Sequence, residues 1–212
     1  MHSKRSSMPA FWPVARKTKV WAVVTGQGPH SKKNSIPLGV VVRDVLKLTP
    51  SLTEAKKVIN EGRITVNGTV RKGYRFPIGT MDLVEIPDTK STYRVTSSHS
   101  GLDFEETKDT SILCKITNKT AVRKGKTQYT THNGLTLLAE SKYRVRDTLR
   151  LDSKRKITGH FRFEPGSSAI ITGGRLRGTT GKIKEIGDRV SLETKEGMVE
   201  TIRDYIFVTG EK

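Results

Sequence analysis

The sequence predicts an α+β protein that is mostly β, on three observations. Short apolar runs separated by turn residues fill the chain after residue 87, which is typical of β strands. Apolar residues at helical spacing are confined to residues 37–60. The first 35 residues mix cations, prolines, glycines and serines and cannot build a core alone. We therefore expect a basic N-terminal arm at 1–35, a small domain of two helices on a short sheet at 36–87, a central β domain at 88–165 and a C-terminal β-barrel at 166–212.

The composition indicates a nucleic-acid partner. The 212-residue chain carries 39 Lys and Arg against 21 Asp and Glu, a formal net charge of +18. Neutralising phosphate is the commonest physical reason for such an excess, and an ordinary basic surface is the alternative. The excess is uneven, since the arm has seven Lys or Arg and no Asp or Glu.

The sequence predicts no catalytic residue, no metal and no cofactor. The single cysteine, Cys114, lies in an apolar run, where it is expected to be a small buried strand residue. No neighbouring histidine supports a thiol nucleophile. There is no apolar run of about 18 residues and no recognisable secretory leader, so we expect a cytoplasmic protein without membrane contact or a small-molecule substrate.

The arm is expected to stay disordered in isolation and to fold on binding. Its cations can meet phosphates, and its aromatic residues are available for stacking or for docking on a neighbouring domain. The candidate RNA-binding residues of the arm are His2, Lys4, Arg5, Trp12, Arg16, Lys17, Lys19, His30, Lys32 and Lys33.

Two helices and a hairpin are predicted for residues 36–87. The first helix covers residues 37–48, with a buried strand as the alternative because valine and leucine dominate it. The second begins at Ser51, which has capping-box spacing to Glu54, and ends at Gly62 as a left-handed cap. Asn67-Gly68 then suits a tight hairpin turn.

The cations of this domain are expected to form an exposed phosphate-binding surface. The expectation concerns chiefly the cations of the two helices, with further candidates along the hairpin and the segment after it. The candidates are Arg43, Lys47, Lys56, Lys57, Arg63, Asn67, Arg71, Lys72 and Arg75.

The central β domain contains one candidate contact loop, formed by Arg123, Lys124 and Lys126. His132 precedes Asn133-Gly134 and is interpreted as a hairpin-turn residue rather than a base. His160 alternates with Phe161 on a predicted strand and is interpreted as an ordinary surface residue.

The C-terminal segment has glycines at 173, 174, 178 and 181 after an apolar strand. We expect Gly181 to make a tight turn, and the loop to bring Arg175, Arg177 and backbone amides close to an anion. A Walker-type nucleotide loop is excluded because no Gly-Lys followed by Ser or Thr opens a helix.

Two segments resemble known RNA-binding units. Glu54-Ala55, Val58-Ile59, Gly62-Arg63-Ile64 and Val66-Asn67-Gly68, with Pro77, Gly79 and Asp82, resemble the alpha-L motif of bacterial small-subunit ribosomal protein four. Many relatives have an arginine directly after the helix-start serine, and Leu52 stands there instead, so that phosphate contact is not carried over. The glycine-rich segment resembles a KOW motif.

The order of these units resembles the "e" family of small-subunit ribosomal protein four, found in archaea and eukaryotes. Further matches span the chain: His2, Lys4-Arg5, Pro9, Trp12, Gly28-Pro29-His30, Phe76 to Asp82, Thr131 to Gly134 and Ile206-Phe207-Val208. The resemblance implies a non-catalytic constituent of the small ribosomal subunit with an archaeal source. Its implied partners are ribosomal RNA, bound through phosphate and shape, and neighbouring small-subunit proteins. A free RNA-binding translation factor and an RNA-modification factor are the alternatives.

Overall fold

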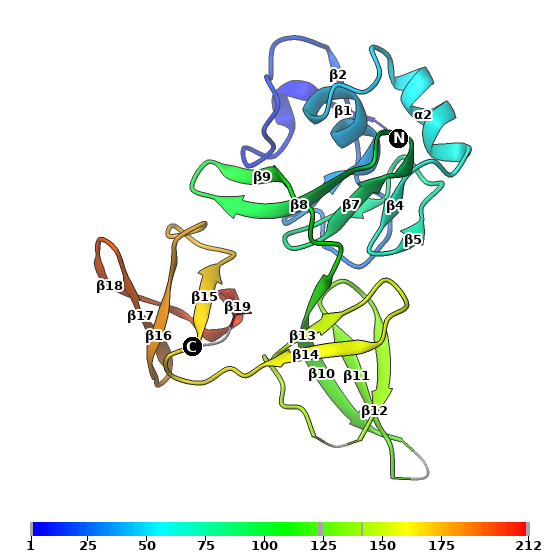
Figure 1. The fold of residues 1–212 in the computed structure, drawn as a ribbon. Coiled ribbons are helices and arrows are strands. Elements are labelled where there is room, and N and C mark those ends of the chain that lie inside the picture. Colours follow the sequence, from blue (N-terminus) through cyan, green and yellow to red (C-terminus); the bar gives the residue numbers. More distant parts are fainter. Residues whose placement is uncertain (1, 123–124, 141, 211–212) are drawn as a thin grey trace. The chain divides into compact units, whose positions relative to one another are not determined.

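The structure is a computed structural model that describes residues 2–122, 125–140 and 142–210. The chain divides into two compact units. Unit 1 contains the residues up to 96 together with 100–110, and unit 2 contains 97–99 together with the residues from 111 onward. Figure 1 shows helix α2 in unit 1 and only strands and short turns in most of unit 2. The protein is mostly β, as predicted.

Unit 1 is built on a five-stranded sheet in the order β5-β4-β7-β8-β9. Its strands are β4 (Thr65–Val66), β5 (Thr69–Val70), β7 (Leu83–Ile86), β8 (Ser91–Ser98) and β9 (Gly101–Glu106). A second, two-stranded pairing joins β3 (Ile36–Pro37) to β6 (Pro77–Ile78). The sheet therefore extends through β8 and β9, which lie beyond residue 87, and β9 has no counterpart in the sequence-based prediction.

The first helical segment is shorter and less regular than predicted. Helix α1 covers Leu38–Val40 and continues as a π-helical segment, η2, over Val41–Val45. Consecutive β-branched valines lower helix propensity, and Lys47 then adopts a left-handed backbone with φ of 53°. The segment thus ends before the predicted Leu48, but it is helical rather than a buried strand.

Helix α2 covers Leu52–Asn60 and matches the prediction at both ends. Ser51 is the N-cap, and its Oγ accepts a hydrogen bond from the Glu54 amide at 3.2 Å. The Glu54 carboxylate accepts from Ser51 Oγ, so only half of the predicted capping box is formed. Gly62 follows with φ of 80°, the conformation of a glycine C-cap.

The hairpin between β4 and β5 turns at Asn67-Gly68, as predicted. Both residues have positive φ, 52° and 67°, which is the signature of a type I′ turn. The Asn67 side chain is buried, and its Oδ1 accepts from the Leu83 amide on β7 at 2.9 Å. One residue therefore shapes the turn and ties it to the next strand.

The N-terminal arm is packed against the rest of unit 1. It contains β1 (His2–Lys4), the 3-10 turn η1 (Arg5–Ser7) and β2 (Trp21–Val23), and β1 pairs with β2. The Trp12 indole is buried in the same apolar cluster as Ile59 and Val84, and its Nε1 donates to the Ser35 carbonyl at 3.0 Å. Of the two alternatives for the aromatic residues of the arm, docking on a neighbouring domain holds for Trp12, which is part of the core of unit 1, whereas Trp21 is exposed.

Unit 2 begins with a five-stranded antiparallel sheet in the order β12-β11-β10-β13-β14. The strands are β10 (Ile112–Ala121), β11 (Thr127–Thr131), β12 (Thr136–Ala139), β13 (Thr148–Leu151) and β14 (Ile157–Phe161). Cys114 is fully buried in β10, and the turn after His132 joins β11 to β12, both as predicted.

A second antiparallel sheet follows in unit 2, in the order β18-β17-β16-β15-β19. Its strands are β15 (Ser168–Ile171), β16 (Thr180–Ile186), β17 (Arg189–Thr194), β18 (Gly197–Ile202) and β19 (Ile206–Gly210). Its apolar core contains Ile171, Ile183, Leu192, Ile206 and Val208. Two 3-10 turns remain, η3 (Pro87–Thr89) in unit 1 and η4 (Arg203–Tyr205) in unit 2.

The predicted turn at Gly181 is wrong. Gly181 lies inside β16 and pairs with Ala169 of β15. A Cβ atom at this position would lie 2.5 Å from the Glu193 carbonyl oxygen, so the glycine permits a close approach of two strands.

No helix among residues 2–122, 125–140 and 142–210 is long and apolar enough to cross a membrane.

Candidate nucleic-acid interface

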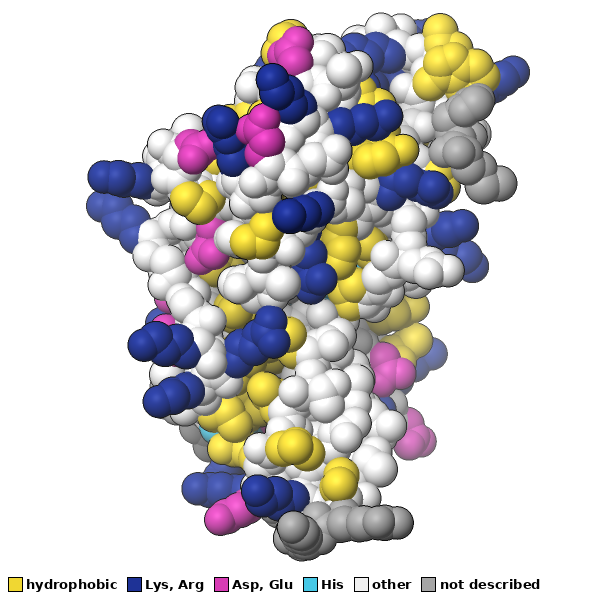
Figure 2. All heavy atoms as spheres, turned by 90° about the vertical axis from the view of Figure 1, so that its right-hand side faces the viewer, with side chains coloured by type: hydrophobic (Ala, Val, Ile, Leu, Met, Phe, Trp, Pro, Cys, Tyr) yellow, Lys and Arg dark blue, Asp and Glu magenta, His cyan; other side chains and the backbone are white. Residues whose placement is uncertain are grey.

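The cations of unit 1 fall into two groups, one buried with partners inside the protein and one exposed. The face shown in Figure 2 displays the exposed kind, with Lys and Arg side chains spread widely and Asp and Glu sparse. The exposed candidates of unit 1 are Lys4, Arg16, Lys17, Lys19, Lys32, Lys33, Lys47, Lys57, Arg63 and Lys72. The side chains of this group reach solvent, where a phosphate can approach them.

Three cations surround the carboxylate of Asp44. Arg43 binds it in a fork, with Nε 3.1 Å from Oδ1 and Nη2 2.6 Å from Oδ2. Arg5 Nη1 lies 3.4 Å away and Lys19 Nζ 4.0 Å away. Arg5 and Arg43 are both buried; Arg5 joins the arm to η2 through Asp44, whereas the contact of Arg43 with Asp44 stays within η2.

The buried carboxylate of Asp82 is a second point at which the arm is joined to the rest of unit 1. Its Oδ1 accepts from Asn67 Nδ2 at 2.7 Å, and its Oδ2 accepts from the Gly79 amide at 2.8 Å. His30 Nε2 lies 2.8 Å from the same Oδ2. The structure therefore places His30 and Asn67 as internal supports of the turn that follows β6.

The pKa of His30 is set by two opposing effects. Burial removes the imidazole from water and alone would lower its pKa, but the charge of Asp82 and its hydrogen bond raise the pKa above the ordinary value. Gly79 allows this contact, because a Cβ there would lie 2.5 Å from the His30 ring. Gly28 packs equally closely on Pro77, where an added Cβ would lie at 2.4 Å.

The segment after β5 runs along α2 and places cations over aromatic rings. Lys56 Nζ lies 4.5 Å from the centre of the Tyr74 ring, and the Arg71 guanidinium carbon lies 4.4 Å from that of Phe76. Lys72 passes next to Gly62 at the end of the helix. We call Lys56, Arg71 and Lys72 the α2 edge. Cation–π contact restricts two of these side chains while leaving their charge.

The remaining candidates of this domain have partners in the protein. Arg63 pairs with Glu61 at 2.8 Å and with Asp88 at 3.4 Å. Arg75 Nε donates to the Val24 carbonyl at 3.0 Å and so ties the arm to the α2 side of unit 1. Of the predicted surface, Arg43 and Arg63 thus pair with carboxylates, while Lys47, Lys56 and Lys57 have no carboxylate partner among the described residues.

The glycine-rich loop after β15 is used for packing. Gly173 and Gly174 lie against the Tyr205 ring, and a Cβ on Gly178 would lie 2.7 Å from the Ser98 backbone. The Gly178 amide donates to the Ile171 carbonyl at 2.8 Å, so this amide does not face an anion. Burial lowers the pKa of Arg177, whose Nε donates to Ser97 Oγ at 3.4 Å, while Arg175 is exposed.

In the central sheet, the structure exposes Lys126, whereas Arg123 and Lys124 lie outside the described residues. The side chain of His2 likewise lies outside the described part of the chain. His132 is fixed in its turn, where its Nδ1 accepts from the Lys115 amide at 3.1 Å. Among the residues that the structure describes, no group of three or more His, Cys, Asp or Glu could hold a metal ion.

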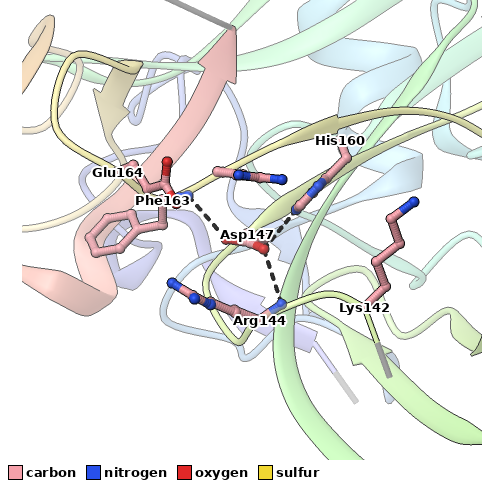
Figure 3. A pocket seen from close by; sticks show the side chains of 7 residues that line it. Lys142, Arg144, Asp147, His160, Phe163 and Glu164 are labelled. Carbon is pink, nitrogen blue, oxygen red and sulfur yellow. Dashed lines mark hydrogen bonds and ion pairs between the residues drawn. The ribbon is translucent and has the colours of Figure 1, made fainter. Parts of the chain in front are cut away.

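The interpretation of His160 as an ordinary surface residue is wrong. Its Nε2 lies 2.7 Å from Oδ2 of the buried Asp147, and its ring packs edge-on against Tyr143 at 4.9 Å. Asp147 and His160, which Figure 3 labels, line a cavity of about 140 Å³ together with Lys142, Arg144 and Arg162. Strand periodicity predicted that His160 lies on a strand. Its contact with Asp147 could not be predicted in this way, because it depends on the pairing of β13 with β14.

Three family models match successive parts of the chain: the RS4NT (NUC023) domain at residues 1–33, the S4 domain at 39–84 and the Ribosomal family S4e at 86–157. The small ribosomal subunit protein eS4 of Methanocella arvoryzae is 40% identical over 220 residues, which covers 99% of this chain and 94% of that protein. The eS4 protein of Methanothermobacter thermautotrophicus is 38% identical over 223 residues, covering 99% and 92%.

A solved structure gives the same result. The crystal structure of the 30S ribosomal protein S4e from Thermoplasma acidophilum matches with a TM-score of 0.71 and 28% identity, covering 84% of this chain and 96% of that one. Sequence and fold thus define a non-enzymatic ribosomal protein with an S4 RNA-binding domain. The chain belongs to the eS4 family of small ribosomal subunit proteins. This confirms the predicted class and its ribosomal, cytoplasmic setting.

Proposed function

We propose that this protein is a structural constituent of the small ribosomal subunit that binds ribosomal RNA through many phosphate and shape contacts, and so acts in subunit assembly and translation. One observation carries the proposal. Eight of the candidate cations of unit 1 are exposed and have no carboxylate partner among the residues that the structure describes. They are Lys4, Arg16, Lys17, Lys32, Lys33, Lys47, Lys57 and Lys72.

Their placement favours an RNA backbone over base readout. Lysine is a flexible point charge that attracts phosphate without fixing a base edge. Double-stranded RNA is recognised mostly by its shape and by phosphate and 2′-hydroxyl contacts. The exposed Trp21 on β2 adds a surface on which an unstacked base can lie, whereas the buried Trp12 does not.

We also propose that the second sheet of unit 2 is a KOW-type barrel that adds contacts to the same RNA. Its support is the run from β15 through the glycine-rich loop into β16, together with the exposed Arg175. Exposed apolar side chains on β18, Met198 and Ile202, favour a neighbouring small-subunit protein as a further partner of this sheet.

The salt dependence of RNA binding tests the proposal. The full chain is titrated onto small-subunit ribosomal RNA between about 50 and 200 mM salt. We expect the logarithm of the affinity to fall steeply with the logarithm of the salt concentration, because each phosphate contact releases counterions. A slope indistinguishable from zero would remove the phosphate mechanism.

A pair of charge variants locates the contact. Lys56→Gln/Lys72→Gln removes two charges from the α2 edge, and we expect a weaker affinity and a shallower salt slope by about one to two units. Lys90→Gln/Lys108→Gln removes two exposed charges elsewhere in unit 1 and is the matched control. Equal losses in both pairs would show a diffuse charge effect and would contradict an interface at the α2 edge.

A further inference from the structure

The cavity beside Asp147 is the strongest unassigned feature of unit 2. It measures about 140 Å³, and its walls include Lys142, Arg144, His160 and Arg162. The side chains of Lys142, Arg144 and Arg162 are exposed, and no carboxylate among the described residues pairs with them. Three cations without a carboxylate partner in the described part of the chain thus line one cavity.

Asp147 is a buried residue in the lining of this cavity, and its carboxylate binds two backbone amides. Its Oδ2 accepts from the Arg144 amide at 3.0 Å, and its Oδ1 accepts from the Phe163 amide at 3.0 Å. The Arg144 amide belongs to the loop before β13. The Phe163 amide belongs to the chain after β14 and directly follows Arg162. The buried carboxylate therefore fixes the backbone at Arg144 and next to Arg162, while its own oxygens are already bound.

Two carboxylates in the wall have to be weighed against the cations. Asp147 is 3% exposed and accepts from two amides and from His160, so little of its charge faces the opening. Glu164 also lines the cavity, but Figure 3 shows it beside Phe163, on the far side of Asp147 from Lys142. The lining therefore holds three Lys or Arg side chains against one buried, hydrogen-bonded carboxylate and one further carboxylate, Glu164.

We infer that this cavity binds a phosphate group of the ribosomal RNA backbone, with Arg144 and Arg162 as the contacting residues and Asp147 as the positioning residue. Guanidinium groups suit the task because their planar N–H donors match phosphate oxygens in pairs. Lys142 adds a third charge at the mouth. The inference rests on the proposed function, since it specifies a second RNA contact, in unit 2 and outside the S4 domain.

The experiment measures the affinity of the full chain for small-subunit ribosomal RNA at several salt concentrations. We expect Arg144→Gln/Arg162→Gln to weaken binding about tenfold and to make the salt slope shallower by about one unit, as for the loss of one phosphate contact. The matched control is Lys154→Gln/Lys156→Gln, which removes two exposed charges from the same unit away from the cavity. The control is expected to change affinity much less.

The outcomes separate this inference from the proposed function. Absence of salt-dependent RNA binding by the unmodified chain overturns the proposed function and the inference together. Binding by the unmodified chain with equal losses in the two double variants overturns the inference alone and leaves the cations of unit 2 as a solvated surface. If the double variant does not fold, as judged by its thermal unfolding, Arg162→Gln is compared with Lys154→Gln by the same criteria.

Discussion

Two buried basic side chains, His30 in unit 1 and Lys115 in unit 2, respond to burial in opposite ways. His30 contacts the carboxylate of Asp82 at 2.8 Å, and that charge raises its pKa despite burial. Lys115 Nζ donates to the carbonyls of Asp204 and Ile206 at 2.8 and 2.7 Å, and burial lowers its pKa to about 8. For His30 the charge and hydrogen bond of Asp82 outweigh burial, whereas for Lys115 burial outweighs the charge of Asp204 and Arg146 lowers the pKa further.

The comparison teaches that the positive charge of this chain has two roles. Buried cations have partners inside the protein: Arg5 joins the arm to η2 through Asp44, and Arg43 binds the same carboxylate within η2. Exposed cations such as Lys57 and Lys72 have no such partner in the part of the chain that the structure describes, and they are available to phosphate. The predictions below address the buried groups, beginning with the largest expected effect.

Asp82→Ala is expected to destabilise unit 1 by about 3–5 kcal/mol, because it leaves the buried donors of His30, Asn67 and Gly79 without their acceptor. Chemical denaturation measures the change in the free energy of unfolding. Asp88→Ala, which removes an exposed carboxylate from η3, is the control and should have no measurable effect. A small loss for Asp82→Ala would show that water replaces the carboxylate.

The stability of unit 2 is expected to rise with pH by as much as about 3 kcal/mol between pH 8 and 10.5, because the pKa of Lys115 is lowered from 10.5 to about 8. As the pH rises, Lys115 releases its proton first in the folded state. The stabilisation is therefore fully present above the unfolded-state pKa of 10.5, and it is lost as the pH falls through the folded-state pKa of about 8. Unfolding free energies across this range should show the rise in the unmodified chain and not in Lys115→Met. The same rise in both proteins would assign it to other groups.

Gly79→Ala is expected to cost about 1–3 kcal/mol, because the new Cβ would lie 2.5 Å from the His30 ring. A double-mutant cycle with His30→Ala identifies the cause. If the clash is responsible, the cost of Gly79→Ala disappears in the His30→Ala background. An unchanged cost would mean that the glycine is required by its own backbone.

The pH dependence from His30 is expected to be smaller than that from Lys115, because burial opposes the attraction of Asp82. Since the folded pKa is raised, the stabilisation is fully present below the ordinary histidine pKa of 6.5 and is lost as the pH rises through the folded value. His30→Gln should remove this decline from the denaturation curves of unit 1. A decline that persists in His30→Gln would refute the assignment.

Local elements were predictable because their causes are local. The helix cap at Ser51, the stop at Gly62 and the turn at Asn67-Gly68 each depend on a few neighbouring residues. Sequence also identified the class of protein through its basic arm and hairpin motif. The irregular π-helical segment was not predictable from spacing alone, because its valines suit both a helix and a strand.

The individual contacts were less predictable because burial is not local. Arg5 and Lys4 are adjacent in sequence, yet Arg5 is buried against Asp44 and Lys4 is exposed. Likewise, Asp147 and His160 meet only because β13 pairs with β14. A cation in a basic sequence therefore indicates a phosphate contact only after its internal partners are known.

Sedimentation of the full chain with small ribosomal subunits tests the central claim most directly. A structural constituent bound through many phosphate contacts should stay with the subunits in stoichiometric amount through moderate salt. A free translation or RNA-modification factor would instead wash off or remain substoichiometric. Retention at one copy per subunit is the result we expect, and loss at moderate salt would contradict the proposed function.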